Sequence, residues 1–181
     1  MSPEAASVAS QLLLDGFSRV REGVAAVLDD IDEHHLTWRP GPDANTIAWL
    51  VWHLTRVQDD HLADAFGRPQ LWDSEGWASR FSLPAAPGAT GHGATGYGMS
   101  PSDVGQVSAS ADTLLGYHQA VAERTSSLVA SMGPGDLDRI VDERWDPPVT
   151  LAIRLVSVIS DDLQHVGQAA YVRGLAQRAA S

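Results

Sequence analysis

An aspartate and a histidine lie four residues apart in the last third of the chain, Asp161 and His165. In a helix this spacing places both side chains on one face, as neighbours along the axis. A carboxylate and an imidazole so placed can bind one metal ion at about 2.0–2.2 Å. They can also form a simple surface hydrogen bond, which is the commoner role of such a pair.

A second histidine, His53, lies within the most apolar stretch of the chain, Trp49 to Leu54. This setting predicts a buried imidazole, which requires a hydrogen-bonding partner or a metal ion. If its helix faces the one that carries Asp161 and His165, the three side chains form a His₂Asp site. Three protein ligands leave open positions on the ion, as in catalytic zinc sites.

Three more residues on the helix of His53 are candidates for catalysis or ligand binding. Asp60 returns to the face of His53 and can orient that ring or carry a proton, although the pair Asp59-Asp60 can equally be exposed. His61 is displaced by about 80° from His53, which predicts a place on the substrate side or at an interface. Arg56 can bind an anionic substrate or cofactor, or pair with a nearby carboxylate.

The connection over residues 68–106 contains further candidate ligand-binding residues. Trp72 and Trp77 can line a pocket or anchor the core. Tyr97 lies in a glycine-rich run and can cover the site together with His92, unless the run is simply flexible. The run is not a phosphate loop, because no Gly-Lys-Ser/Thr follows it. Three other histidines are expected at polar or interfacial positions without a functional role: His34, His35 and His118.

Helices are the elements that must position these residues. Apolar residues recur at three-and-four spacing, and no alternating strand pattern is visible. The connection over residues 68–106 lacks periodicity and is expected to be irregular, as a lid or an insertion. The sequence therefore predicts an all-α fold, a four-helix bundle in a single domain spanning residues 1–181. The predicted helices cover residues 3–31, 46–66, 108–132 and 150–177.

Composition excludes several classes of function. Twelve basic residues against 23 acidic ones give a formal charge of −11, which argues against nucleic-acid binding. No apolar run approaches the ~20 residues of a membrane span and no signal peptide is visible, so we expect a soluble, cytoplasmic protein. The chain has no cysteine. A sulfur nucleophile must therefore arrive with a cosubstrate.

Two segments resemble a known family: residues 45–61, NTIAWLVWHLTRVQDDH, and residues 160–174, SDDLQHVGQAAYVRG. Together they resemble the DinB-like superfamily, and within it the actinobacterial branch of mycothiol-dependent enzymes such as maleylpyruvate isomerase and related thiol transferases. The resemblance covers nearly the whole chain and implies an up-down-down-up bundle. It also implies that His53, Asp161 and His165 bind a divalent metal. Many members carry histidine at the position of Asp161, whereas the maleylpyruvate isomerase type carries an acid.

The resemblance implies a metal-dependent transferase or isomerase that uses a low-molecular-weight thiol, mycothiol if the source makes it. A thiol coordinated to a metal is deprotonated, which supplies a nucleophile at neutral pH. A histidine-containing site favours a transition metal such as zinc or nickel over magnesium. The expected partners are the thiol, a small-molecule substrate and a second copy of the chain in a homodimer. The alternative is a non-catalytic, stress-related bundle that binds a metal or a small molecule.

Overall fold

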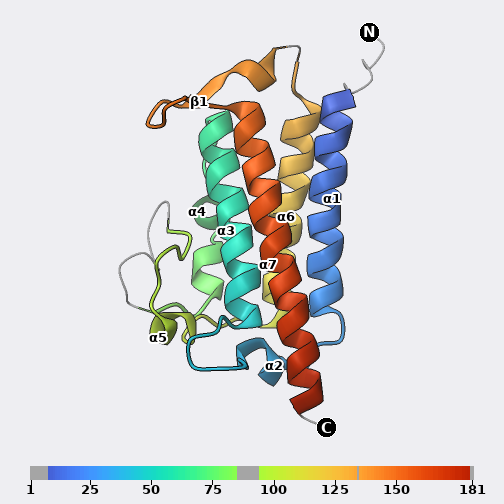
Figure 1. Cartoon of the computed structure of the whole chain (residues 1–181), viewed down its shortest axis with the longest axis vertical. Helices are drawn as coiled ribbons and strands as arrows, with labels where there is room; N and C mark the ends of the chain where they lie inside the picture. Colours follow the sequence, from blue (N-terminus) through green and yellow to red (C-terminus); the bar gives the residue numbers. More distant parts are fainter. Residues whose placement is uncertain (1–7, 85–93, 134, 180–181) are drawn as a thin grey trace.

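The computed structural model describes residues 8–84, 94–133 and 135–179, and four long helices dominate it. They are α1 (Val8–Leu28), α3 (Ile47–Phe66), α6 (Ala111–Ala130) and α7 (Leu151–Ala179). Figure 1 shows α1 and α7 running in one direction and α3 and α6 in the opposite direction. The predicted all-α, up-down-down-up bundle is therefore confirmed. The expected start of the first helix, at residues 3–7, lies outside the described residues.

The order of the helices around the bundle explains the length of the central connection. The helix α3 packs against α6 and α7, and α1 packs against the same two helices. Since α3 and α6 are neighbours that run in the same direction (Figure 1), no tight turn can join them. The chain must return along the bundle before α6 begins.

The described part of this connection is partly folded into short helices. They are α4 (Leu71–Ser74), the 3₁₀ turn η1 (Trp77–Arg80) and α5 (Pro101–Val104). Three buried aromatic residues fix the first half to Tyr117 of α6, with ring centroids 5.3 Å away for Trp72, 5.4 Å for Trp77 and 5.9 Å for Phe81. Isolated aromatic anchors leave no helical periodicity in a sequence, so the pattern alone did not indicate them.

The other two connections also contain structure that the sequence did not predict. The helix α1 ends at Leu28 rather than near residue 31, and α2 (Glu33–Thr37) follows with Asp32 as its N-cap. After α6 come the 3₁₀ turn η2 (Asp136–Asp138) and an antiparallel hairpin of β1 (Ile140–Asp142) and β2 (Val149–Thr150). The hairpin lies over the end of the bundle where α3 finishes and α7 begins (Figure 1).

Local signals set the ends and faces of the helices that carry the site. The Thr46 side chain caps α3 by accepting from the backbone N–H of Trp49, and Gly67 closes the helix in a left-handed conformation. On α7, Leu163 is exposed although it is a large apolar residue. The adjacent Asp162 takes the core position, because it continues the spacing of Leu155 and Val158. In the described ranges no helix is long and apolar enough to cross a membrane.

Candidate metal centre

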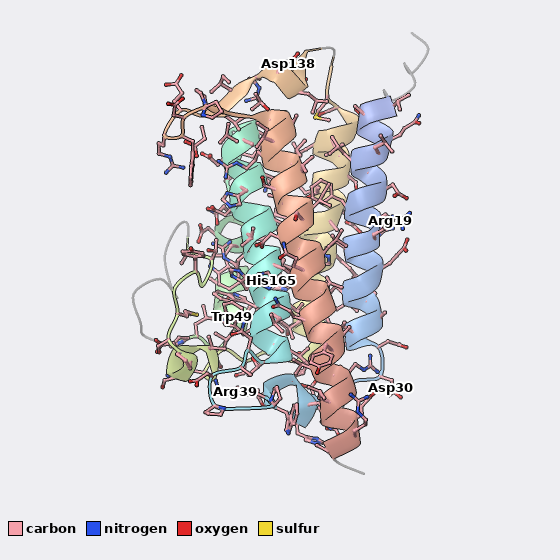
Figure 2. All side chains as sticks on the ribbon, viewed as in Figure 1. Arg19, Asp30, Arg39, Trp49, Asp138 and His165 are labelled. Atoms are coloured by element: carbon pink, nitrogen blue, oxygen red, sulfur yellow. The ribbon has the colours of Figure 1, made fainter. Side chains whose placement is uncertain are left out.

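The antiparallel packing of α3 against α7 brings His53, Asp161 and His165 together. One possible ligand atom from each residue lies within 4.8 Å of the other two. The distance from Asp161 Oδ1 to His165 Nε2 is 3.7 Å, and the two imidazole centroids are 4.8 Å apart. Figure 2 shows His165 on α7 and Trp49, which stacks on the His53 ring, in the same part of the bundle.

The hydrogen bonds of both histidines leave one ring nitrogen on each ready for a metal. His53 Nδ1 lies 2.6 Å from the Thr95 carbonyl oxygen, which can only accept. The hydrogen is therefore on Nδ1, and Nε2 keeps its lone pair. His165 Nδ1 donates in the same way to Gln168 Oε1 at 2.9 Å. Metal-binding histidines are usually oriented by an acceptor on their other nitrogen.

The charges around these residues fit a cation. Burial lowers the pKa of His53, against the opposing effect of the Thr95 carbonyl, and thereby favours the neutral imidazole that a metal requires. Asp161 Oδ2 is buried and has no hydrogen-bond partner among the described residues. A buried carboxylate oxygen without a partner is costly. Two neutral nitrogens and one carboxylate thus fit a divalent transition metal.

A cavity of about 430 Å³ opens beside the cluster and includes His53 and Asp161 in its wall. The predicted residues Asp60, His61 and Tyr97 line the same cavity, and the Tyr97 side chain is 90% exposed at its edge. A larger cleft of about 670 Å³ lies under the hairpin and shares Asp60 and His61 with it. His92 lies outside the described residues.

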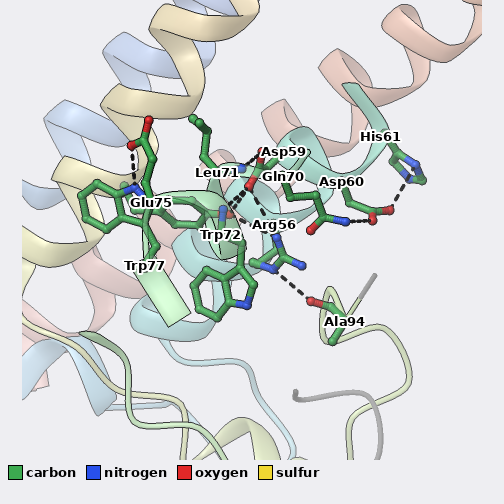
Figure 3. Close-up of polar contacts among 11 residues, drawn as sticks. Arg56, Asp59, Asp60, His61, Gln70, Leu71, Trp72, Glu75, Trp77 and Ala94 are labelled. Atoms are coloured by element: carbon green, nitrogen blue, oxygen red, sulfur yellow. Dashed lines mark hydrogen bonds and ion pairs between the residues drawn. The ribbon is translucent and has the colours of Figure 1, made fainter. Parts of the chain in front are cut away.

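Asp60 does not orient His53 in this structure. Its Oδ1 accepts from Gln70 Nε2 at 2.6 Å, and its Oδ2 lies 3.8 Å from His61 Nδ1 (Figure 3). The acceptor that orients His53 is instead the Thr95 carbonyl. Sequence reasoning missed it, because a backbone carbonyl on a distant loop leaves no signature in residue types.

Arg56 is completely buried and lies outside the lining of the cavity. Its Nε donates to the Ala94 carbonyl at 3.0 Å, and one terminal nitrogen donates to Tyr117 Oη at 3.2 Å. The same nitrogen lies 3.6 Å from Asp59 Oδ2, and the guanidinium lies over the Trp72 ring. Figure 3 shows this environment. In this structure Arg56 therefore pairs with a carboxylate, which was the second of the two roles suggested for it.

Asp59 is the centre of this buried network, although from the sequence the pair Asp59-Asp60 could equally be exposed. Its side chain accepts from the backbone N–H groups of Leu71 and Trp72 at 3.0 and 2.8 Å (Figure 3). It also accepts from Tyr117 Oη at 2.9 Å. Asp59 therefore holds α4 against α3, and Trp72, which is 2% exposed, belongs to the core.

His118 is also buried, contrary to the expectation of a polar or interfacial place. Its Nδ1 lies 3.1 Å from Thr55 Oγ1. Burial lowers the pKa of His118 to about 4, with a smaller effect from Arg21. The sequence signal is its spacing from Leu114 and Val121 on the apolar face of α6.

The buried network also positions the loop over the metal centre. Arg56 binds the carbonyl of Ala94, and the next residue, Thr95, binds His53. Gly96 follows with φ of 90°, and a Cβ there would lie 2.5 Å from the Trp52 ring. Only glycine fits this position without displacing the ring.

The fold and the cluster define a helical-bundle protein with a candidate metal centre, and comparison with known proteins gives its family. The family model of the DinB superfamily matches residues 17–169, so the chain belongs to that superfamily, which includes metal-binding enzymes. The crystal structure of a conserved protein from Enterococcus faecalis is similar, with a TM-score of 0.81 and 29% identity. The similarity covers 91% of this chain and 94% of that one. No curated protein matches.

Proposed function

We propose that the protein is a metal-dependent transferase or isomerase that activates a low-molecular-weight thiol. His53, Asp161 and His165 bind the ion, zinc or nickel. The observation that carries the proposal is the clustering of the three residues, two of which, His53 and Asp161, lie in the wall of a cavity of about 430 Å³. A cavity of that size accepts a small molecule next to the ion.

The chemistry of the donor set supports this function. A three-ligand site keeps positions open for an exogenous ligand, and an ion there supplies the charge that stabilises a bound thiolate. The chain has no cysteine, so the sulfur belongs to the cosubstrate. The resemblance of residues 45–61 and 160–174 to mycothiol-dependent enzymes favours mycothiol as that thiol.

Residues of the cavity wall carry the remaining roles in this proposal. Asp60 and His61 lie side by side at the cavity and serve as proton carriers. Burial lowers the pKa of His61, and Arg154 lowers it further, so the ring is neutral at pH 7. Tyr97 covers the bound small molecules from the exposed edge.

The test begins with metal content, measured by plasma mass spectrometry on protein purified without an affinity tag. We expect one zinc or nickel ion per chain in the wild type, and its loss in His165→Ala. The control is His34→Ala, since His34 lies on the short helix α2, apart from the cluster. Absence of metal from the wild type, even after incubation with both ions, would refute the metal site.

Turnover is measured next, with mycothiol and a panel of small electrophiles. We expect a product that requires both the metal and the thiol. Metal binding without thiol-dependent turnover would support the alternative, a non-catalytic metal-binding bundle.

We also propose that the protein is a homodimer. Exposed apolar side chains along α7, including Val156, Leu163 and Tyr171, support a contact between copies. Size-exclusion chromatography with light scattering tests this, and a monomer at micromolar concentration would refute it.

A further inference from the structure

Arg154 projects into the cavity of the metal centre from the same helix that carries two of the ligands. It lines the cavity together with His53, His61 and Asp161. Arg154 precedes Asp161 by seven residues, so it lies on the same face of α7, about 10 Å away along the helix axis. The cavity thus has a candidate metal centre at one end and a guanidinium at the other.

The hairpin holds this guanidinium in place. Asp142 of β1 accepts from one terminal nitrogen of Arg154 at 2.9 Å, and the other terminal nitrogen lies 2.9 Å from His61 Nδ1. The Arg154 side chain is only 13% exposed. An arginine fixed at both terminal nitrogens loses little conformational entropy when it binds a ligand.

The same contacts leave donors available to a ligand. A guanidinium has five N–H groups, and the contacts with Asp142 and His61 use one on each terminal nitrogen. Since arginine can only donate, His61 Nδ1 accepts, and its hydrogen is on Nε2. Burial and the charge of Arg154 both lower the pKa of His61, which keeps the ring in this neutral form. Arg154 and His61 therefore present N–H groups together.

Two arginines near this end of the cavity share one hairpin carboxylate. Asp60, Asp161 and Asp64 also act on His61; Gln70 donates to one oxygen of Asp60, and a divalent ion held by the candidate ligands would balance Asp161. Arg154 shares Asp142 with Arg144, so the hairpin carboxylate does not fully neutralise it. A planar guanidinium with free N–H groups matches the geometry of an oxyanion such as a carboxylate or a phosphate.

We propose that Arg154 and His61 form an oxyanion subsite, which selects ligands with a carboxylate or phosphate about two helical turns from the metal-bound group. Asp142 is a positioning residue for this subsite. The proposal rests on the proposed function, because it describes the far end of the same ligand. It also transfers to Arg154 the anion-binding role that the sequence suggested for Arg56.

The test measures binding of three thiols to the zinc-loaded protein by isothermal titration calorimetry. They are 6-mercaptohexanoate, 6-mercaptohexanol and 6-aminohexanethiol, which share one sulfur and chain length and differ only in the charge of the far group. We expect the carboxylate to bind at least tenfold more tightly than the alcohol, since hydrogen bonds to a charged group are stronger than those to a neutral one. The amine should bind most weakly.

Variants assign the preference to the subsite. In Arg154→Gln the ratio between carboxylate and alcohol should fall to near one, while the alcohol binds as in the wild type. Arg154→Lys keeps a charge next to Asp142 and should retain part of the preference. The matched control is Arg144→Gln, because Arg144 also binds Asp142 but is 82% exposed and lies outside this cavity. It should retain most of the preference, with a small loss because Asp142 then pairs with Arg154 alone.

The outcomes separate this proposal from the proposed function. Equal affinity for the three thiols, or a preference that survives in Arg154→Gln, overturns the oxyanion subsite while leaving the metal-bound thiol intact. Failure of all three thiols to bind overturns the thiol function itself. In that case hexanoate and inorganic phosphate, titrated alone, test the subsite independently: binding lost in Arg154→Gln supports it, and absence of binding overturns it.

Discussion

The candidate metal centre and the buried network around Asp59 both take residues from α3, and they differ in whether their hydrogen-bond acceptors have partners. In the network, the Asp59 carboxylate accepts three hydrogen bonds and lies beside the Arg56 guanidinium. In the metal centre, His53 and His165 present bare nitrogens, and Asp161 Oδ2 has no hydrogen-bond partner in the described chain. Nitrogen and oxygen atoms that lie next to a cavity and have no hydrogen-bond donor indicate a binding site. A buried polar group that already has its hydrogen-bond partners does not.

The two regions also differ in net charge. The network contains one cation and one anion, so it is neutral without any ligand. The candidate metal centre contains one carboxylate and no arginine, so a bound metal ion would balance it. The network therefore contributes to the stability of the chain itself, and the metal centre contributes only when an ion is bound.

The largest effect is expected from removing the centre of the network. Asp59→Ala leaves the Arg56 charge buried and the N–H groups of Leu71 and Trp72 without their acceptor. We expect a loss of about 3–5 kcal/mol in the free energy of unfolding, measured by urea denaturation. The neighbouring variant Asp60→Ala, which loses one hydrogen bond to Gln70, should cost about 1 kcal/mol. An equal loss of unfolding free energy in the two variants would contradict the central role of Asp59 in the network.

The second effect concerns pH and the buried His118. The unfolded chain binds a proton at this ring near pH 6.5, while the pKa of about 4 keeps the folded ring neutral. The contribution of the neutral His118 to the free energy of unfolding is therefore fully present above pH 6.5. It falls by about 3 kcal/mol as the pH decreases toward 4. Urea denaturation at pH 7 and pH 4 should show this slope reduced in His118→Asn and unchanged in the exposed control His34→Asn. An unreduced slope in His118→Asn would assign it to other groups.

The third effect tests the metal centre as a region that depends on its ion. Zinc at 100 times its dissociation constant should stabilise the wild type by about 2.7 kcal/mol, seen as a higher melting temperature by calorimetry. In His165→Ala this gain should disappear. Without metal, the variant should unfold within about 1 kcal/mol of the wild type. A large loss of stability in the metal-free variant would mean that the cluster is part of the core.

The fourth effect is expected at Gly96, which lies between the two regions and should change stability less than the three effects above. Gly96→Ala places a methyl group against the Trp52 ring at a positive φ, at a cost of about 1–2 kcal/mol. Because Thr95 orients His53, zinc affinity should fall by about tenfold, measured by competition with a chelating dye. Gly98→Ala also has a positive φ but meets no described atom within 4 Å. It should leave the affinity unchanged.

The sequence contained enough to predict the cluster of His53, Asp161 and His165, because helical spacing fixes the relative directions of Asp161 and His165. It also contained the signal for Arg154, seven residues before Asp161 on the same face, which was overlooked. The difference between Asp59 and Asp60 was not accessible, since it depends on where α4 docks. The hairpin that supplies Asp142 was not accessible either, because its strands of three and two residues are too short to show alternation.

The hydrogen bond from Arg56 to the Ala94 carbonyl couples docking of the loop to binding of the metal ion. The loop must dock for Thr95 to orient His53, and an ion that binds the oriented ring must in turn favour the docked loop. The coupling is reciprocal and of equal size in both directions. Metal binding should therefore slow amide hydrogen exchange in residues 94–99, so that the loop reports on an ion that it does not touch.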